Sequence, residues 1–203
     1  MTREHFNESW LAEMPERIGA TELIDMLEYN IKDLIKNGAK QEQVGTLQKI
    51  ELDTVVYYWQ TDSNGTITIA VEFGKKPNTL VVHAVGKRGK GGKTPFASDL
   101  YLAVLNDRKG ANNSISLSSD DTMSDKGFDI WKRLLQSGHS ISLYDKSSPG
   151  QTHTRINSVE ELSSFFKDDR DFRRYQYILS EGDGLEVRAQ FLTRRTRELA
   201  GLL

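Results

Sequence analysis

TVVYYWQTDSNGTITIAVEFG, residues 54–74, contains two runs of β-branched and aromatic residues separated by a polar turn. Such runs are typical of β-strands, and the Asn-Gly pair between them is a strong signal for a hairpin turn. A third run, TLVVHAVGK at residues 79–87, follows a second turn. The sequence therefore predicts an antiparallel meander of three strands.

Helical patterns flank this meander on both sides. Residues 21–37 place apolar side chains at helical spacing and are followed by a glycine. After the meander come a helix that begins near Pro95, a strand at residues 114–119, a helix through FDIWKRLLQ and a strand at residues 139–145. We expect an α/β or α+β fold in which helices flank a mixed, mainly antiparallel central sheet.

Three segments are expected from this pattern. Residues 1–48 form an N-terminal helical segment, residues 49–146 the core, and residues 147–203 an arginine-rich helical lobe. A capped helix is predicted in that lobe at SVEELSSFFKD, where Glu161 follows Ser158 by three residues.

Composition excludes several classes of protein. The 203 residues carry 27 Lys and Arg against 29 Asp and Glu, so no global charge attracts nucleic acid or an anionic membrane. Cysteine is absent, and the four histidines are never at metal-ligand spacing, so we expect no metal site. Without a signal peptide or a long apolar run, we expect a soluble cytoplasmic protein with no membrane contact.

A turn rich in glycine and lysine, KRGKGGK at residues 87–93, joins the third strand to the next helix. Glycines allow close backbone approach, and helix N-termini favour anions, so this order of elements can bind phosphate. Its spacing fits neither the Walker nor the Rossmann pattern. The alternative is a solvated surface loop, which is the usual role of such charge runs.

The turn resembles the pyrophosphate loop of the GNAT family of N-acetyltransferases. Arg88 matches the family's first position and Gly91 its glycine three residues on, whereas Lys93 stands where the family has glycine or alanine. The order of elements over residues 50–145 is also similar to that of the family. The resemblance implies acetyl-CoA as the cofactor, with its pantetheine arm between splayed strands. It assigns cofactor binding to Arg88, Gly89, Lys90, Gly91, Gly92 and Lys93.

Catalytic residues follow only by analogy with the family. Acyl transfer to an amine needs a group that accepts the amine's proton, and Glu72, in the second strand, stands where such a fold can present a base. His83 lies on the next strand. Trp131 occupies the place of a tyrosine that often protonates the leaving thiolate, so Tyr144 is the substitute candidate.

Two functions remain open. The stretches WLAEMP and SDKGFDIWKRL resemble acetyltransferase-like proteins of tailed bacteriophages, which implies the host cytoplasm or the virion as location. The first function is N-acylation of a small-molecule or protein amine. The second is a non-catalytic virion or assembly protein, in which arginines and aromatics of the C-terminal lobe contact a protein partner or a second copy. Acidic residues nearly cancel the charge of these arginines, so nucleic-acid binding is not predicted.

Overall fold

A computed structural model describes residues 20–89, 96–109, 115–120, 123–147, 153–166 and 174–180. The helices are α2 (Ala20–Lys36), α3 (Ala97–Lys109), α4 (Asp125–Gln136) and α5 (Val159–Ser164). The strands are β1 (Gln41–Val44), β2 (Leu47–Glu51), β3 (Val55–Thr61), β4 (Ile67–Lys76), β5 (Thr79–Lys87), β6 (Ser116–Ser118), β7 (Ile141–Asp145), β8 (Thr154–Ile156) and β9 (Tyr175–Leu179).

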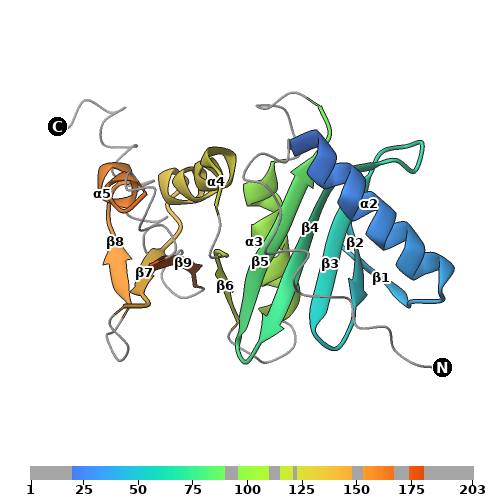
Figure 1. The fold of residues 1–203 in the computed structure, drawn as a ribbon, viewed down its shortest axis with the longest axis horizontal. Coiled ribbons are helices and arrows are strands. Elements are labelled where there is room, and N and C mark those ends of the chain that lie inside the picture. Colours follow the sequence, from blue (N-terminus) through green and yellow to red (C-terminus); the bar gives the residue numbers. More distant parts are fainter. Residues whose placement is uncertain are drawn as a thin grey trace, which may run out of the picture.

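All these strands belong to one sheet, with the order β1-β2-β3-β4-β5-β6-β9-β7-β8 (Figure 1). Neighbouring strands are antiparallel except β5 and β6, which are parallel and are joined through α3. The first five strands lie side by side in chain order, whereas β9 lies between β6 and β7. The expected mixed, mainly antiparallel sheet with flanking helices is confirmed.

The central meander forms as its turn residues predict. Between β3 and β4, the Asp62 carboxylate accepts hydrogen bonds from the backbone N–H groups of Asn64 and Thr66, both at 2.9 Å. Gly65 has φ of +77°, a conformation in which a side chain is strained. At the β4–β5 turn Asn78 takes φ of +57°, which asparagine tolerates better than most residues. Local turn chemistry therefore sets the register of β3, β4 and β5.

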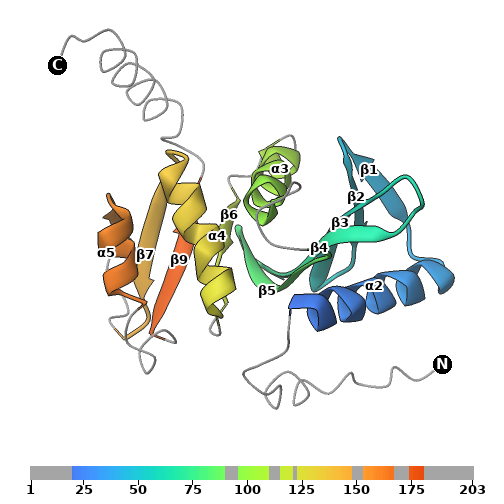
Figure 2. The ribbon, with the colours of Figure 1, turned by 90° about the horizontal axis from the view of Figure 1, so that it is seen from above.

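Helices cover the two faces of the sheet unequally (Figure 2). On one face, Ile24, Leu27 and Ile31 of α2 are fully buried against β2, β3 and β4. On the opposite face, α3, α4 and α5 share one larger apolar cluster with the sheet. We call these the α2 face and the α3 face.

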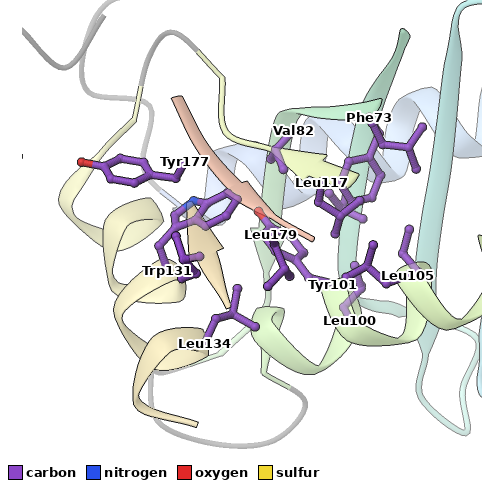
Figure 3. Packing of buried hydrophobic residues seen from close by; sticks show 14 of the residues in the cluster. Phe73, Val82, Leu100, Tyr101, Leu105, Leu117, Trp131, Leu134, Tyr177 and Leu179 are labelled. Carbon is purple, nitrogen blue, oxygen red and sulfur yellow. The ribbon is translucent and has the colours of Figure 1, made fainter. Parts of the chain in front are cut away.

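Aromatic side chains link the helices of the α3 face to the sheet. Trp131 of α4 is 2% exposed, and its ring centroid lies 6.2 Å from that of Tyr101 and 5.9 Å from that of Tyr177. Figure 3 shows Trp131 reaching from α4 toward β9, beside Tyr177 and Leu179. Edge-on and tilted aromatic pairs of this kind add to the free energy gained by burial alone.

Two of the expected segments differ from the structure. Residues 41–44 form β1 and Leu47 begins β2, so the segment up to residue 48 is not helical throughout. The polar sequence QEQV conceals β1, because it is an edge strand whose side chains are mostly exposed.

The C-terminal lobe expected from residue 147 to residue 203 is also not a separate helical unit in its described part. The helix predicted at SVEELSSFFKD is α5, and Ser158 Oγ accepts a hydrogen bond from the Glu161 N–H at 3.1 Å, as the capping pattern predicts. However, β9 pairs with β6 on one side and with β7 on the other. Residues 175–179 are therefore inside the main sheet. The remaining expectation for this lobe lies outside the described residues.

Candidate functional site

The parallel strands β5 and β6 pair over the whole of the short β6 but only over the amino-terminal part of β5. Residues 79–81 of β5 are in register with residues 116–118 of β6. Beyond Val81, β5 continues to Lys87 and is in register with β4 alone among the described strands. After β6, Ser119 donates its backbone N–H to the Tyr177 carbonyl at 2.8 Å, so the chain follows β9 instead of β5. The pairing of β5 with β6 thus ends before the glycine-rich turn begins.

Of the residues predicted to bind a cofactor, the structure describes Arg88 and Gly89. Arg88 donates from Nε to the Ile67 carbonyl at 3.0 Å, and its Nη2 forms ion pairs with Asp25, at 2.6 Å, and with Glu28 of α2. Gly89 has φ of +89°, which favours glycine. Lys90, Gly91, Gly92 and Lys93 lie outside the described residues. Arg88 therefore fastens the start of the turn to α2, and its guanidinium is engaged by two carboxylates.

The Arg88 contacts also order α2. Glu28 is 8% exposed and pairs with both Arg88 and Lys32. The hydrogen bond from Lys32, and after it the one from Arg88, hold the pKa of the Glu28 carboxyl below its ordinary value against the effect of burial. A buried carboxylate with two cationic partners stays charged, so this cluster fixes how α2 lies on β5.

Glu72 lies in a cluster of titratable side chains on the α2 face. It alternates along β4 with Val71 and Phe73, which are buried on the α3 face. Its Oε1 is 3.4 Å from Nδ1 of His83, and Tyr57 is opposite Glu72 on β3. A bulge in the β4–β5 pairing places His83 between the paired residues Val82 and Ala84. Three adjacent strands thus contribute to one cluster of tyrosine, glutamate and histidine.

Electrostatics in this cluster favour a proton on His83. The hydrogen bond to Glu72 raises the pKa of the His83 imidazole, and the Asp120 charge adds to this, whereas burial and Lys76 oppose it. Burial and then the Glu72 charge raise the pKa of the Tyr57 hydroxyl, which stays protonated. The side chains of Glu72 and His83 are 14% and 33% exposed, so both remain accessible to solvent.

The His83 pKa provides the first test. We expect the imidazole to titrate above its ordinary value of about 6.5 and the variant Glu72→Gln to lower that pKa. Because the folded state binds this proton more tightly, its stabilisation is complete below the ordinary pKa and is lost as pH rises through the raised one. The measurement is an NMR titration of the His83 Cε1 proton, assigned by its loss in His83→Gln. Glu160→Gln, on α5, is the control, and an unchanged His83 pKa in Glu72→Gln would contradict the pairing.

Tyr144, the other predicted catalytic residue, is far from this cluster. It lies on β7, where its ring packs edge-on against His153 with centroids 5.5 Å apart. In the sheet, β5, β6 and β9 separate β7 from β4. Four strand spacings correspond to about 19 Å, so the structure does not bring Glu72 and Tyr144 together.

Trp131 and Tyr177 form part of the core. The Tyr177 hydroxyl is buried and has no hydrogen-bond partner among the described groups, and burial raises its pKa. Sequence reasoning missed Tyr177 and Tyr57. The register of the β3–β4 hairpin, counted from the Asn-Gly turn along both strands, could have indicated that Tyr57 lies near Glu72. Tyr177 was missed because its segment was predicted to be part of a helical lobe.

A second charged cluster is structural. Lys49, on β2, lies 3.1 Å from Glu42 and 3.4 Å from Asp107, and Asp107 accepts a 2.7 Å hydrogen bond from the Tyr58 hydroxyl. These contacts tie the carboxyl end of α3 to β1, β2 and β3. The Lys49 ammonium and the carboxylates of Glu42 and Asp107 are paired with one another, so we assign this cluster no ligand.

Within the arginine-rich C-terminal region, the structure describes Arg174. Its guanidinium forms a bidentate pair with Asp145 of β7, with Nη2 2.6 Å from Oδ2. The hydrogen bonds from Arg174, followed by those from Ser147, hold the pKa of the Asp145 carboxyl well below its ordinary value. Arg174 therefore helps to join β9 to β7. The other arginines from residue 170 onward lie outside the described residues.

Metal sites and membrane-spanning helices each have requirements that the described part of the chain does not meet. Within it, no three His, Asp or Glu side chains gather as a metal site, and no helix is long and apolar enough to cross a membrane.

No family model, curated protein or solved structure matches this chain.

Proposed function

We propose that this protein is an acyl-CoA-dependent N-acyltransferase. The observation that carries the proposal is that β5 continues to Lys87 after its pairing with the parallel strand β6 has ended at Val81, and then leads into a turn rich in glycine. A strand edge of this kind offers backbone groups to a pantetheine arm, and the following turn can bind phosphates through its amides. The resemblance to the GNAT family supports the same interpretation.

The cluster around Glu72 supports the chemical step. In acyl transfer the amine nitrogen attacks the thioester carbonyl, a C–N bond forms, and the C–S bond breaks. The amine loses a proton, and the departing thiolate gains one. Glu72 accepts the amine's proton, directly or through one water, while His83 holds the carboxylate in place. Tyr57, protonated beside Glu72, donates a hydrogen bond that keeps the carboxylate oriented.

Cofactor binding tests this proposal through the turn. Gly91→Asp introduces a side chain and a negative charge where backbone amides are expected to bind the phosphates of acetyl-CoA. The affinity for acetyl-CoA should therefore fall by at least about tenfold. The measurement is titration calorimetry of acetyl-CoA into wild type and variant. Gly45→Asp makes the same change in the β1–β2 turn, at the far edge of the sheet, where a Cβ meets nothing within 4 Å and where φ is +57°, a conformation that aspartate tolerates better than most residues. No binding by wild type, or equal affinity in both variants, would refute the proposal.

A second function is favoured by the Arg88 contacts. Asp25 and Glu28 engage the guanidinium that the family pattern assigns to the loop, and Trp131 replaces the tyrosine of the family. A non-catalytic virion or assembly protein that keeps the fold would accommodate both departures. Such a protein would bind no acetyl-CoA in the same calorimetry and would self-associate or capture a virion protein in sedimentation experiments.

A further inference from the structure

Three elements of the α3 face meet at the ring of Phe96. Phe96 directly precedes α3, and its carbonyl accepts hydrogen bonds from the N–H groups of Asp99 and Leu100 in the first turn of that helix. Lys87, the last residue of β5, places Nζ 5.3 Å from the ring centroid. Arg133, from α4, places Cζ 3.3 Å from the same centroid. Two cationic groups from distant parts of the sequence therefore lie on one aromatic ring.

The position of Arg133 is suited to binding an anion. A guanidinium stacked on an aromatic ring keeps its N–H groups directed outward in its own plane, where they can bind phosphate in a bidentate manner. Arg133 is exposed, whereas Leu134, the next residue of α4, is fully buried. The stacking fixes the guanidinium in one place, so less conformational entropy is lost when an anion binds.

This cationic pair also adjoins the glycine-rich turn, because Lys87 is the first residue of that turn. Lys87 is four residues beyond His83 on β5, which corresponds to about 13 Å along a strand. Lys87 meets Phe96 on the α3 face, whereas His83 contacts Glu72 on the α2 face. The pairing of β5 with β6 ends at Val81, so no described strand pairs with residues 82–87 on the side away from β4.

We propose that Arg133 and Lys87, gathered on Phe96, bind phosphate groups of an acyl-CoA beside the glycine-rich turn. This inference rests on the proposed acyltransferase function and adds a phosphate subsite outside the glycine-rich turn.

Calorimetry with acetyl-CoA tests the subsite through Arg133→Gln. We expect this variant to weaken acetyl-CoA binding by about tenfold, since it removes one charge-assisted bidentate contact. Raising the salt concentration should weaken wild-type binding more than binding by the variant. Lys132→Gln is the matched control, because Lys132 is the neighbouring residue of α4, carries the same charge and is paired with Asp129. Urea unfolding of both variants shows whether either one loses stability.

The outcomes separate this inference from the function beneath it. If wild type does not bind acetyl-CoA, the acyltransferase proposal fails and the subsite fails with it. If wild type binds but Arg133→Gln and Lys132→Gln have equal affinities, only the subsite is overturned. A loss of affinity that follows a loss of stability in Arg133→Gln would also overturn it. Tighter binding of ADP than of acetyl-CoA would assign the subsite to a free nucleotide and overturn the acyl-CoA assignment.

Discussion

Trp131→Ala is expected to lower the free energy of unfolding by about 3–5 kcal/mol, the range seen when a buried aromatic side chain is removed. Trp131 is 2% exposed and packs between Tyr101 of α3 and Tyr177 of β9. Its removal leaves a cavity where α3, α4 and the sheet meet, and rigid secondary structure on several sides limits collapse of that cavity. Urea unfolding monitored by far-UV circular dichroism measures the loss.

Trp131→Phe is the comparison variant. It retains an aromatic ring and removes less volume, so its cost should be clearly smaller than that of alanine. Equal and small effects of the two substitutions would show that Trp131 is not a central core residue. Trp131 could then lie at a site that a ligand reaches, as the tyrosine of the acetyltransferase family does. The burial of Trp131 argues against such a position.

The central part of the fold could be predicted because its signals are local. The turn at residues 62–65 contains its own capping carboxylate, Asp62, and its own glycine. The helix α2 shows its buried face in Ile24, Leu27 and Ile31, which recur at helical spacing. Such signals lie within a few residues of the structure that they determine.

The place of β9 could not be predicted, because its partners are distant in sequence. Leu179 is in register with both Leu117 and Ile141. Nothing in the sequence YQYIL specifies that it enters the sheet between β6 and β7, and the arginines around it suggested a helical lobe that contacts a partner. The partners of such a strand depend on which strand edges are exposed once the rest of the sheet has formed. The sequence around the strand does not contain that information.

The candidate site was predictable as single residues but not as a cluster. The position of Glu72 on a strand of the meander was expected, and so was that of His83 on the next strand. Their contact depends on the bulge between Glu72 and Phe73, which shifts the register of β5 by one residue. Tyr144 was the substitute candidate for the acid of the same reaction, but sheet order differs from chain order, so β7 lies far from β4.

Gly86→Val is expected to lower the free energy of unfolding by about 3 kcal/mol, at the upper end of the range for overpacking substitutions. A Cβ at Gly86 of β5 would lie 2.6 Å from the backbone nitrogen of Ile24 and 2.7 Å from its Cα. Backbone atoms of a helix cannot rotate away as a side chain can, so α2 as a whole must shift. That shift exposes the apolar face of α2 and strains the ion pairs of Arg88 with Asp25 and Glu28.

Gly127→Ala is the control for Gly86→Val. A Cβ at Gly127, in the first turn of α4, meets the flexible Met123 side chain at 3.0 Å, and alanine favours helix. We therefore expect little change in the urea midpoint of this control. Gly86→Ala should fall between the two, because its single methyl group already meets the α2 backbone. A near-neutral Gly86→Ala would show that α2 can move away from β5 at little cost, and the Arg88 cluster would then not hold the start of the glycine-rich turn in place.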